Sequence, residues 1–237
     1  MQKIAKPQSL ENSHHHPLQR LRSPSRGVST LIHLAGLISF AKSFKFIIDN
    51  PNQANEAYGW HFQYLTIIGL TLATLTCVAG LLADILLSRR LFLVKNVLSV
   101  CSAPLAVLVS LLYWGLRIID ERLVLPEWAV LNFWADVGFH AIPGIILVVD
   151  LLLLSPPWTI TALPSMCIAC AIAFSYWFWI ELCYTNNGWY PYPIFGLLTT
   201  GWRVVLFLFS ASMMTTNTIA LKWLHARVNS SGAIKAH

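Results

Sequence analysis

Charged residues are scarce in this chain: they make up 11% of its 237 residues, whereas 56% of the residues are hydrophobic. A soluble domain of this size has about 25% charged residues. The shortage excludes an ordinary soluble domain and indicates an integral membrane protein. The formal net charge is +6, but no basic stripe is interleaved with aromatic residues, so we expect no nucleic-acid partner. The basic N-terminal tail fits an anionic membrane surface better.

Cysteines and catalytic signature motifs are few. The five cysteines all fall in apolar segments, where cysteine usually acts as a small buried packing residue. Cys167 and Cys170 form a C-x-x-C pair without a second pair or histidines at zinc spacing. The chain contains no G-x-S-x-G, no H-E-x-x-H and no Walker-type glycine loop. We therefore expect no disulfide framework, no metal and no cofactor.

Long apolar runs occupy most of the chain, and a spanning helix needs about 20 mostly apolar residues. They predict an all-α, polytopic membrane protein with six transmembrane segments, at about 28–48, 61–87, 92–117, 129–154, 158–184 and 197–224. The chain then divides into a disordered basic tail at 1–27, a six-helix domain at 28–224 and a short basic tail at 225–237. The short loop 155–157 predicts that the fourth and fifth segments pack as an antiparallel pair.

Basic residues in the loops set the orientation of such a protein. They gather in the N-terminal tail, in the loop that follows the second segment and in the C-terminal tail, whereas the loops after the first and fifth segments have none. Both termini are therefore predicted to lie in the cytosol. Arg203, early in the sixth segment, is an exception to this pattern.

His140 is the first candidate for a functional residue. It lies in the apolar run 131–154, and an ionisable side chain at that depth is costly unless it faces a partner or a cavity. Asp136 precedes it by four residues, on the same helix face, and its carboxylate can orient the imidazole. Pro143 removes a backbone hydrogen bond nearby, and a frayed turn in a membrane must line a cavity or be buried in protein.

Thr66 is the candidate nucleophile, with His140 as its base. The structural alternative is a threonine that bonds back to the carbonyl of Phe62. Counted from the segment starts at 1.5 Å per residue, Thr66 lies about 7 Å deep and His140 about 16 Å deep. The pair therefore requires a later start of the fourth segment or a tilted helix.

Other intramembrane polar groups have structural interpretations. Asp84 is expected to pair with Arg89 or Arg90, and Glu181 with Arg203, whereas Asp150 has no evident partner in the sequence. Asn217 is expected to hold helices together.

Three stretches resemble the androgen-induced membrane protein family, which also includes the androgen-dependent regulator of tissue factor pathway inhibitor. They are Trp60–Thr66, Asp136–His140 and Gly188–Pro193, and the resemblance spans about residues 30–224. It implies a threonine hydrolase embedded in the membrane that cleaves fatty acid esters of hydroxy fatty acids, with Thr66 and His140 as the catalytic pair. The chain departs from the animal members at Asp136 and at the Pro156-Pro157 loop.

The expected substrate is therefore a lipid ester that enters from the bilayer, and the expected location is the endoplasmic reticulum or another endomembrane, with the plasma membrane as an alternative. Two other functions remain open. One is a membrane scaffold or signalling protein in which Asp136 and His140 hold helices together. The other is a small proton-coupled transporter with Asp136, His140, Asp150 and Glu181 as relay groups, although the sequence has no internal repeat of the kind many transporters show.

The orientation is directly testable. Epitope tags at either terminus should be accessible only from the cytosol, and a tag after Trp189 only from the opposite side, because of the distribution of basic residues. The measurement is protease protection in sealed microsomes. Protection of the N-terminal tag would contradict this orientation.

Overall fold

The computed structural model describes residues 18–230. Within them, five helices are long and apolar enough to cross a membrane: α1 (Val28–Asp49), α2 (Leu65–Leu86), α3 (Arg89–Ile119), α6 (Ala162–Asn187) and α8 (Thr200–Ser230). A sixth crossing is formed if α4 (Phe133–His140) and α5 (Ile142–Leu154), which are bent by 40° at their junction, are taken as one span. The predicted all-α membrane fold with about six spans is confirmed.

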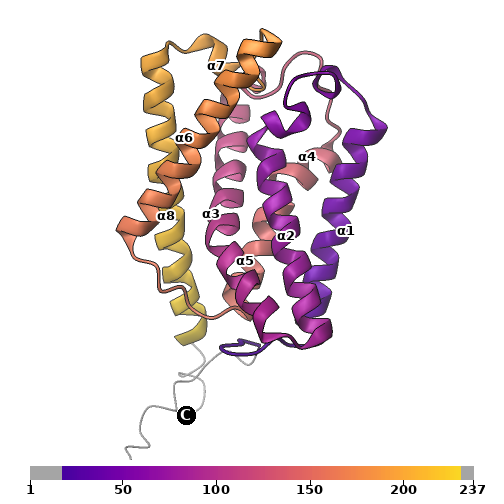
Figure 1. Ribbon diagram of the computed structural model, residues 1–237, viewed down its shortest axis with the longest axis vertical. Helices are drawn as coiled ribbons and strands as arrows, with labels where there is room; N and C mark the ends of the chain where they lie inside the picture. The colour runs from indigo at the N-terminus through magenta and orange to yellow at the C-terminus, as the bar shows by residue number, and fades with distance from the viewer. Residues whose placement is uncertain (1–17, 231–237) are drawn as a thin grey trace, which may run out of the picture.

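Short helices and loops gather at one end of the bundle. The helices η1 (Gln53–Asn55), η2 (Trp60–Gln63), η3 (Glu121–Leu123) and α7 (Ile194–Leu197) lie there, together with α4, at the end opposite the last turns of α8 (Figure 1). The predictions for residues 1–17 and 231–237 of the two tails lie outside the described residues.

Two groups of helices form the bundle. Helices α1, α2, α3 and α5 pack around one apolar core, and α6 and α8 pack on each other. Helix α8 also packs against α3 and α5 and so joins the two groups. The prediction that the fourth and fifth segments form a tight pair was wrong, because residues 155–161 form an extended link that carries the chain from α5 to the far side of α8 (Figure 1).

Helix α2 begins later than the sequence predicted. Gly59 and Trp60 have positive φ angles of 84° and 48°, and Tyr64 is extended, with φ −89° and ψ 126°. The backbone therefore turns through η2 before α2 starts at Leu65, four residues after the predicted start at 61. As a result, Thr66 lies in the first turn of α2, where backbone N–H groups have no partner inside the helix.

The break between α4 and α5 follows from Pro143, which stands in the first turn of α5. Proline cannot donate a backbone hydrogen bond, so it is tolerated in that turn and disfavoured further along a helix. At the break, the carbonyl of His140 accepts a hydrogen bond from the hydroxyl of Ser110 on α3. The break is thus compensated by a neighbouring helix, as a hydrocarbon environment requires.

A buried ionic network joins the helices at the end of the bundle where α8 ends. His33 on α1 contacts Asp84 on α2 through Nδ1 (3.0 Å) and Asp150 on α5 through Nε2 (3.1 Å). Lys95 on α3 donates to Asp150 Oδ2 at 2.9 Å and is 1% exposed. The expected pairing of Asp84 with Arg89 or Arg90 was wrong, because His33, Ser29 and the backbone N–H of Ser25 bind this carboxylate.

The two tails contact the same end of the bundle. Gln19 and His225 both reach the carbonyl of Ser155, so residues that the sequence assigned to tails are packed against the helices. Helix α8 also continues to Ser230, beyond the predicted end at 224.

The position of His33 gives a prediction with a matched control. A Cβ atom added at Gly80 would lie 2.5 Å from Cε1 and 2.9 Å from Cδ2 of His33, whereas one added at Gly69 on the same helix would lie 3.8 Å from its nearest neighbour. Alanine normally stabilises a helix interior relative to glycine by up to about 1 kcal/mol. Gly69→Ala should follow that rule, and Gly80→Ala should instead destabilise the protein by about 1–3 kcal/mol through overpacking. Thermal unfolding in detergent compares them, and equal stability of the two variants would contradict the placement of His33.

Candidate active site

A cavity of about 430 Å³ lies at the end of the bundle that carries α4 and the short helices. Its walls come from spanning helices and from the loops that follow α1 and η3. Thr66 and His140 both line it, together with Tyr113 and Tyr192. The two residues that the sequence singled out therefore face one space, although they are 74 positions apart in the chain.

Asp136, one helical turn earlier on α4, holds the imidazole of His140. The carboxylate Oδ1 lies 2.8 Å from Nδ1 of His140, and both side chains are buried. With Nδ1–H donating to the carboxylate, Nε2 is left as the basic nitrogen. No hydrogen bond among the described residues involves Nε2. This is the geometry in which a carboxylate fixes the tautomer and ring orientation of a general base.

Helix α3 supports this pair from three positions. Arg117 forms an ion pair with the other carboxylate oxygen of Asp136, which offsets the cost of burying the charge. The ring of Tyr113 stacks on the imidazole of His140, with centroids 3.4 Å apart and planes 6° apart. Ser110 binds the backbone carbonyl of His140. These contacts fix both the ring and the backbone of His140.

Thr66 contacts Tyr192 instead of the carbonyl that the structural alternative required. Its Oγ1 lies 3.1 Å from the hydroxyl of Tyr192, and its backbone N–H donates to the same hydroxyl at 3.3 Å. The N–H of Leu65 donates to the hydroxyl of Tyr176 at 3.2 Å. Two tyrosines thus cap the start of α2, whose positive dipole end points at Thr66.

No hydrogen bond joins Thr66 to His140 within residues 18–230. The two share the cavity, and a group placed between them would contact both. The difference in depth between Thr66 and His140 that was counted from the sequence assumed upright helices. Helix α4 is instead bent by 40° from α5 and runs obliquely (Figure 1). Residues along α4 therefore descend by less than the 1.5 Å per residue of an upright helix.

The polar residues that line the cavity carry no net charge of their own. His61 is a buried lining residue, and burial lowers the pKa of its imidazole, so the neutral form prevails at pH 7. Burial also raises the pKa of Tyr192, which keeps its hydroxyl protonated and able to donate. The lining residues include no lysine or arginine.

The other predicted polar groups lie elsewhere. Glu181 and Arg203 form the expected ion pair at 3.0 Å, near Tyr190. Asp150 belongs to the network around His33 and Lys95. In the part of the chain that the structure describes, no three His, Cys, Asp or Glu side chains gather as a metal site.

Sequence reasoning missed the supporting residues Tyr113, Arg117, Tyr176 and Tyr192. Tyr192 lies in the stretch Gly188–Pro193, which carried the resemblance, so a signal for it was present. Arg117 is the last residue of the predicted segment 92–117, and the sequence alone does not tell that α3 continues to Ile119.

Comparison with known proteins agrees with this architecture. The family described as FAR-17a/AIG1-like protein matches residues 28–226. The UPF0641 membrane protein PJ4664.05 of Schizosaccharomyces pombe is 33% identical over 216 residues, which cover 89% of this chain and 96% of that protein. No solved structure matches the chain. The chain belongs to the FAR-17a/AIG1-like family, and it is an integral membrane protein.

Proposed function

We propose that this protein hydrolyses lipid esters within the membrane, with Thr66 as nucleophile and His140 as general base. The observation that supports the proposal is the shared cavity, which is lined by Thr66 and by a histidine whose Nδ1 is held by Asp136. Family membership is compatible with this activity. The substrate class that the resemblance implies is fatty acid esters of hydroxy fatty acids.

The chemistry follows from the roles of these groups. Thr66 Oγ bonds to the ester carbonyl carbon while Nε2 of His140 takes the hydroxyl proton. The imidazolium is stabilised by Asp136. When the tetrahedral intermediate collapses, the bond to the alcohol oxygen breaks and that oxygen takes the proton from His140. Water, deprotonated by His140, then attacks the acyl-threonine, releasing the fatty acid and restoring the Thr66 hydroxyl.

The oxyanion of the tetrahedral intermediate needs hydrogen-bond donors. Two lie beside Thr66: its own backbone N–H, in the first turn of α2, and the hydroxyl of Tyr192. Both are placed before substrate arrives, and the dipole of α2 adds to their effect. In this role Tyr192 releases Thr66 and donates to the substrate oxygen instead. Contacts of this kind commonly tighten only when substrate is bound.

The transporter alternative has less support. Its four relay groups fall into three separate clusters: Asp136 with His140, Asp150 with His33 and Lys95, and Glu181 with Arg203. No hydrogen bond among the described residues links one cluster to another. A proton relay would need such a link or ordered water between them.

The proposal predicts that Thr66 and His140 act as one unit. Thr66→Ala and His140→Ala should each lower turnover of a branched fatty acid ester by at least about 10³-fold, and the double variant should be hardly worse than either. Thr66→Ser should keep part of the activity because it retains the hydroxyl. The measurement is turnover per folded molecule in liposomes, with the folded fraction determined for each variant.

Thr71→Ala is the matched control. Thr71 lies on the same helix, bonds to the carbonyl of Ile67 and lines neither cavity described here, so its loss should leave turnover near the wild-type value. Near-normal turnover by folded Thr66→Ala would end the nucleophile assignment. Additive losses in the double variant would show that the two residues serve separate steps.

A further inference from the structure

A second cavity meets the first at Thr66. It is a narrow cleft of about 90 Å³ between α2, α3, α6 and α8. Thr66, Tyr113, Val124 and Tyr192 line both spaces. The hydroxyl of Thr66 therefore lies where a wide, partly polar cavity joins a narrow apolar cleft.

The cleft runs deep among the spanning helices. Its lining on α3 extends from Leu116 to Leu105, which is about 16 Å at 1.5 Å per residue. Its polar side chains gather at the end near Thr66, apart from Ser210, whose hydroxyl donates to the carbonyl of Leu206. A charged or strongly polar ligand would find no partner deeper in the cleft, so an alkyl chain is the ligand that suits it.

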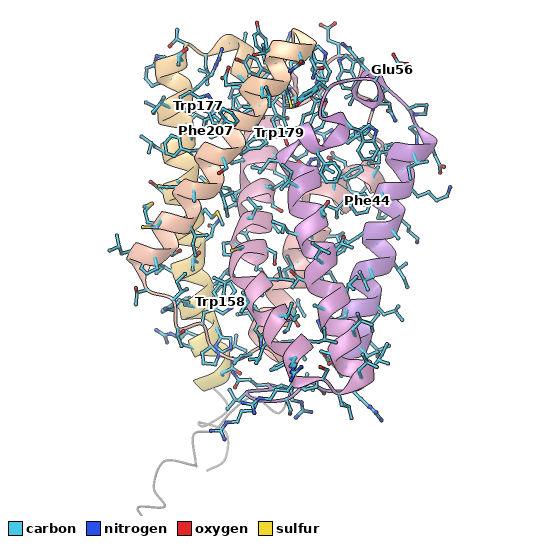
Figure 2. All side chains as sticks on the ribbon, in the orientation of Figure 1. Phe44, Glu56, Trp158, Trp177, Trp179 and Phe207 are labelled. Carbon is cyan, nitrogen blue, oxygen red and sulfur yellow. The ribbon has the colours of Figure 1, made fainter. Side chains whose placement is uncertain are left out.

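Helix α6 forms the outer wall of the cleft and packs mainly on α8. The rings of Trp177 and Phe207 stack between these helices at 5.9 Å (Figure 2). Away from η2, where Trp179 donates to the carbonyl of Phe62, α6 descends obliquely away from α3 (Figure 1). Helices α3 and α6 both line the cleft but make few direct contacts with each other, so we expect a lipid chain to enter the cleft between them.

The two spaces differ in the shape of ligand that they accept. A fatty acyl chain is unbranched from its carbonyl carbon, so it fits a narrow slot. A hydroxy fatty acid esterified at a secondary carbon carries two chains on the carbon that bears the ester oxygen, and it needs the wider cavity of about 430 Å³. The lining of this cavity has no lysine or arginine that could pair with the free carboxylate of the hydroxy fatty acid, so that carboxylate must stay hydrated. We expect it to reach water at the loops that line this cavity.

We propose that the cleft between α3, α6 and α8 holds the acyl chain of the ester that Thr66 attacks, and that Ala169 and Ala173 determine which chain lengths fit. The inference rests on the proposed hydrolase function. The two alanines lie one helical turn apart on α6 and line the cleft. They are buried, at 1% and 9% exposure, and their small side chains leave the space that the chain occupies.

The test is a chain-length profile with a matched pair of variants. Ala173→Phe adds a ring inside the cleft, and Ala171→Phe adds the same ring two residues away, at an exposed position that lines neither cavity. The substrates are esters of one hydroxy fatty acid with butyryl, decanoyl and palmitoyl groups. Ala173→Phe should lower turnover of the palmitoyl ester at least about tenfold relative to the butyryl ester, and Ala171→Phe should keep the wild-type profile. Thermal unfolding checks that both variants fold.

A second measurement needs no catalysis. A palmitic acid that carries a terminal diazirine is photo-crosslinked to the Thr66→Ala protein in liposomes, and the labelled peptides are mapped. Label should concentrate on cleft residues such as Leu105, Ala169 and Met214, and excess palmitic acid should compete. Label spread over the lipid-facing surface, or a palmitoyl preference unchanged in folded Ala173→Phe, would overturn the acyl site. If the acyl site is overturned in this way but the wild-type protein hydrolyses the esters, the hydrolase proposal still holds. If the label is specific to the cleft but the wild-type protein hydrolyses none of the esters, the hydrolase proposal is refuted and the acyl-chain site remains.

Discussion

The carboxylate of Asp136 is the contact on which the candidate site depends. One oxygen holds His140 and the other pairs with Arg117, so a single buried group joins α4 to α3 and fixes the imidazole. In hydrocarbon such a charge is tolerated only when it is paired and hydrogen-bonded. The same requirement explains why the break after His140 is capped by Ser110. The polar groups that hold the helices together are therefore also those that orient the base.

Polar groups inside the bundle are divided between its two ends. At one end, His33, Asp84, Lys95 and Asp150 form a closed network in which each charged group has a partner, and neither of the two cavities described here reaches it. At the other end, Nε2 of His140 has no partner in the described chain and faces a shared cavity. Buried ionisable groups normally pair with one another, so a histidine with an unpartnered Nε2, in a cavity that Thr66 also lines, is the arrangement that indicates chemistry.

The sequence predicted local relations better than relations between helices, although the ion pair of Glu181 on α6 with Arg203 on α8 was predicted correctly. The contact of Asp136 with His140 was predictable because residues four apart lie on one helix face, and the spans were predictable from apolar length. The partner of Asp84 was not, because it depends on how α1 is rotated against α2. The contact of Thr66 with Tyr192 was also not predictable from the sequence. Because α2 starts at Leu65, Phe62 lies outside this helix, and Thr66 binds Tyr192 instead of the carbonyl of Phe62.

The covalent bond between Thr66 and the acyl group is tested most directly by peptide mass spectrometry after reaction with a lipophilic fluorophosphonate. We expect one adduct, on the peptide that contains Thr66, and its loss in His140→Ala protein that remains folded, because the hydroxyl then lacks its base. An adduct on another residue, such as Ser110 or Ser210, in protein that hydrolyses lipid esters would show that Thr66 is not the nucleophile.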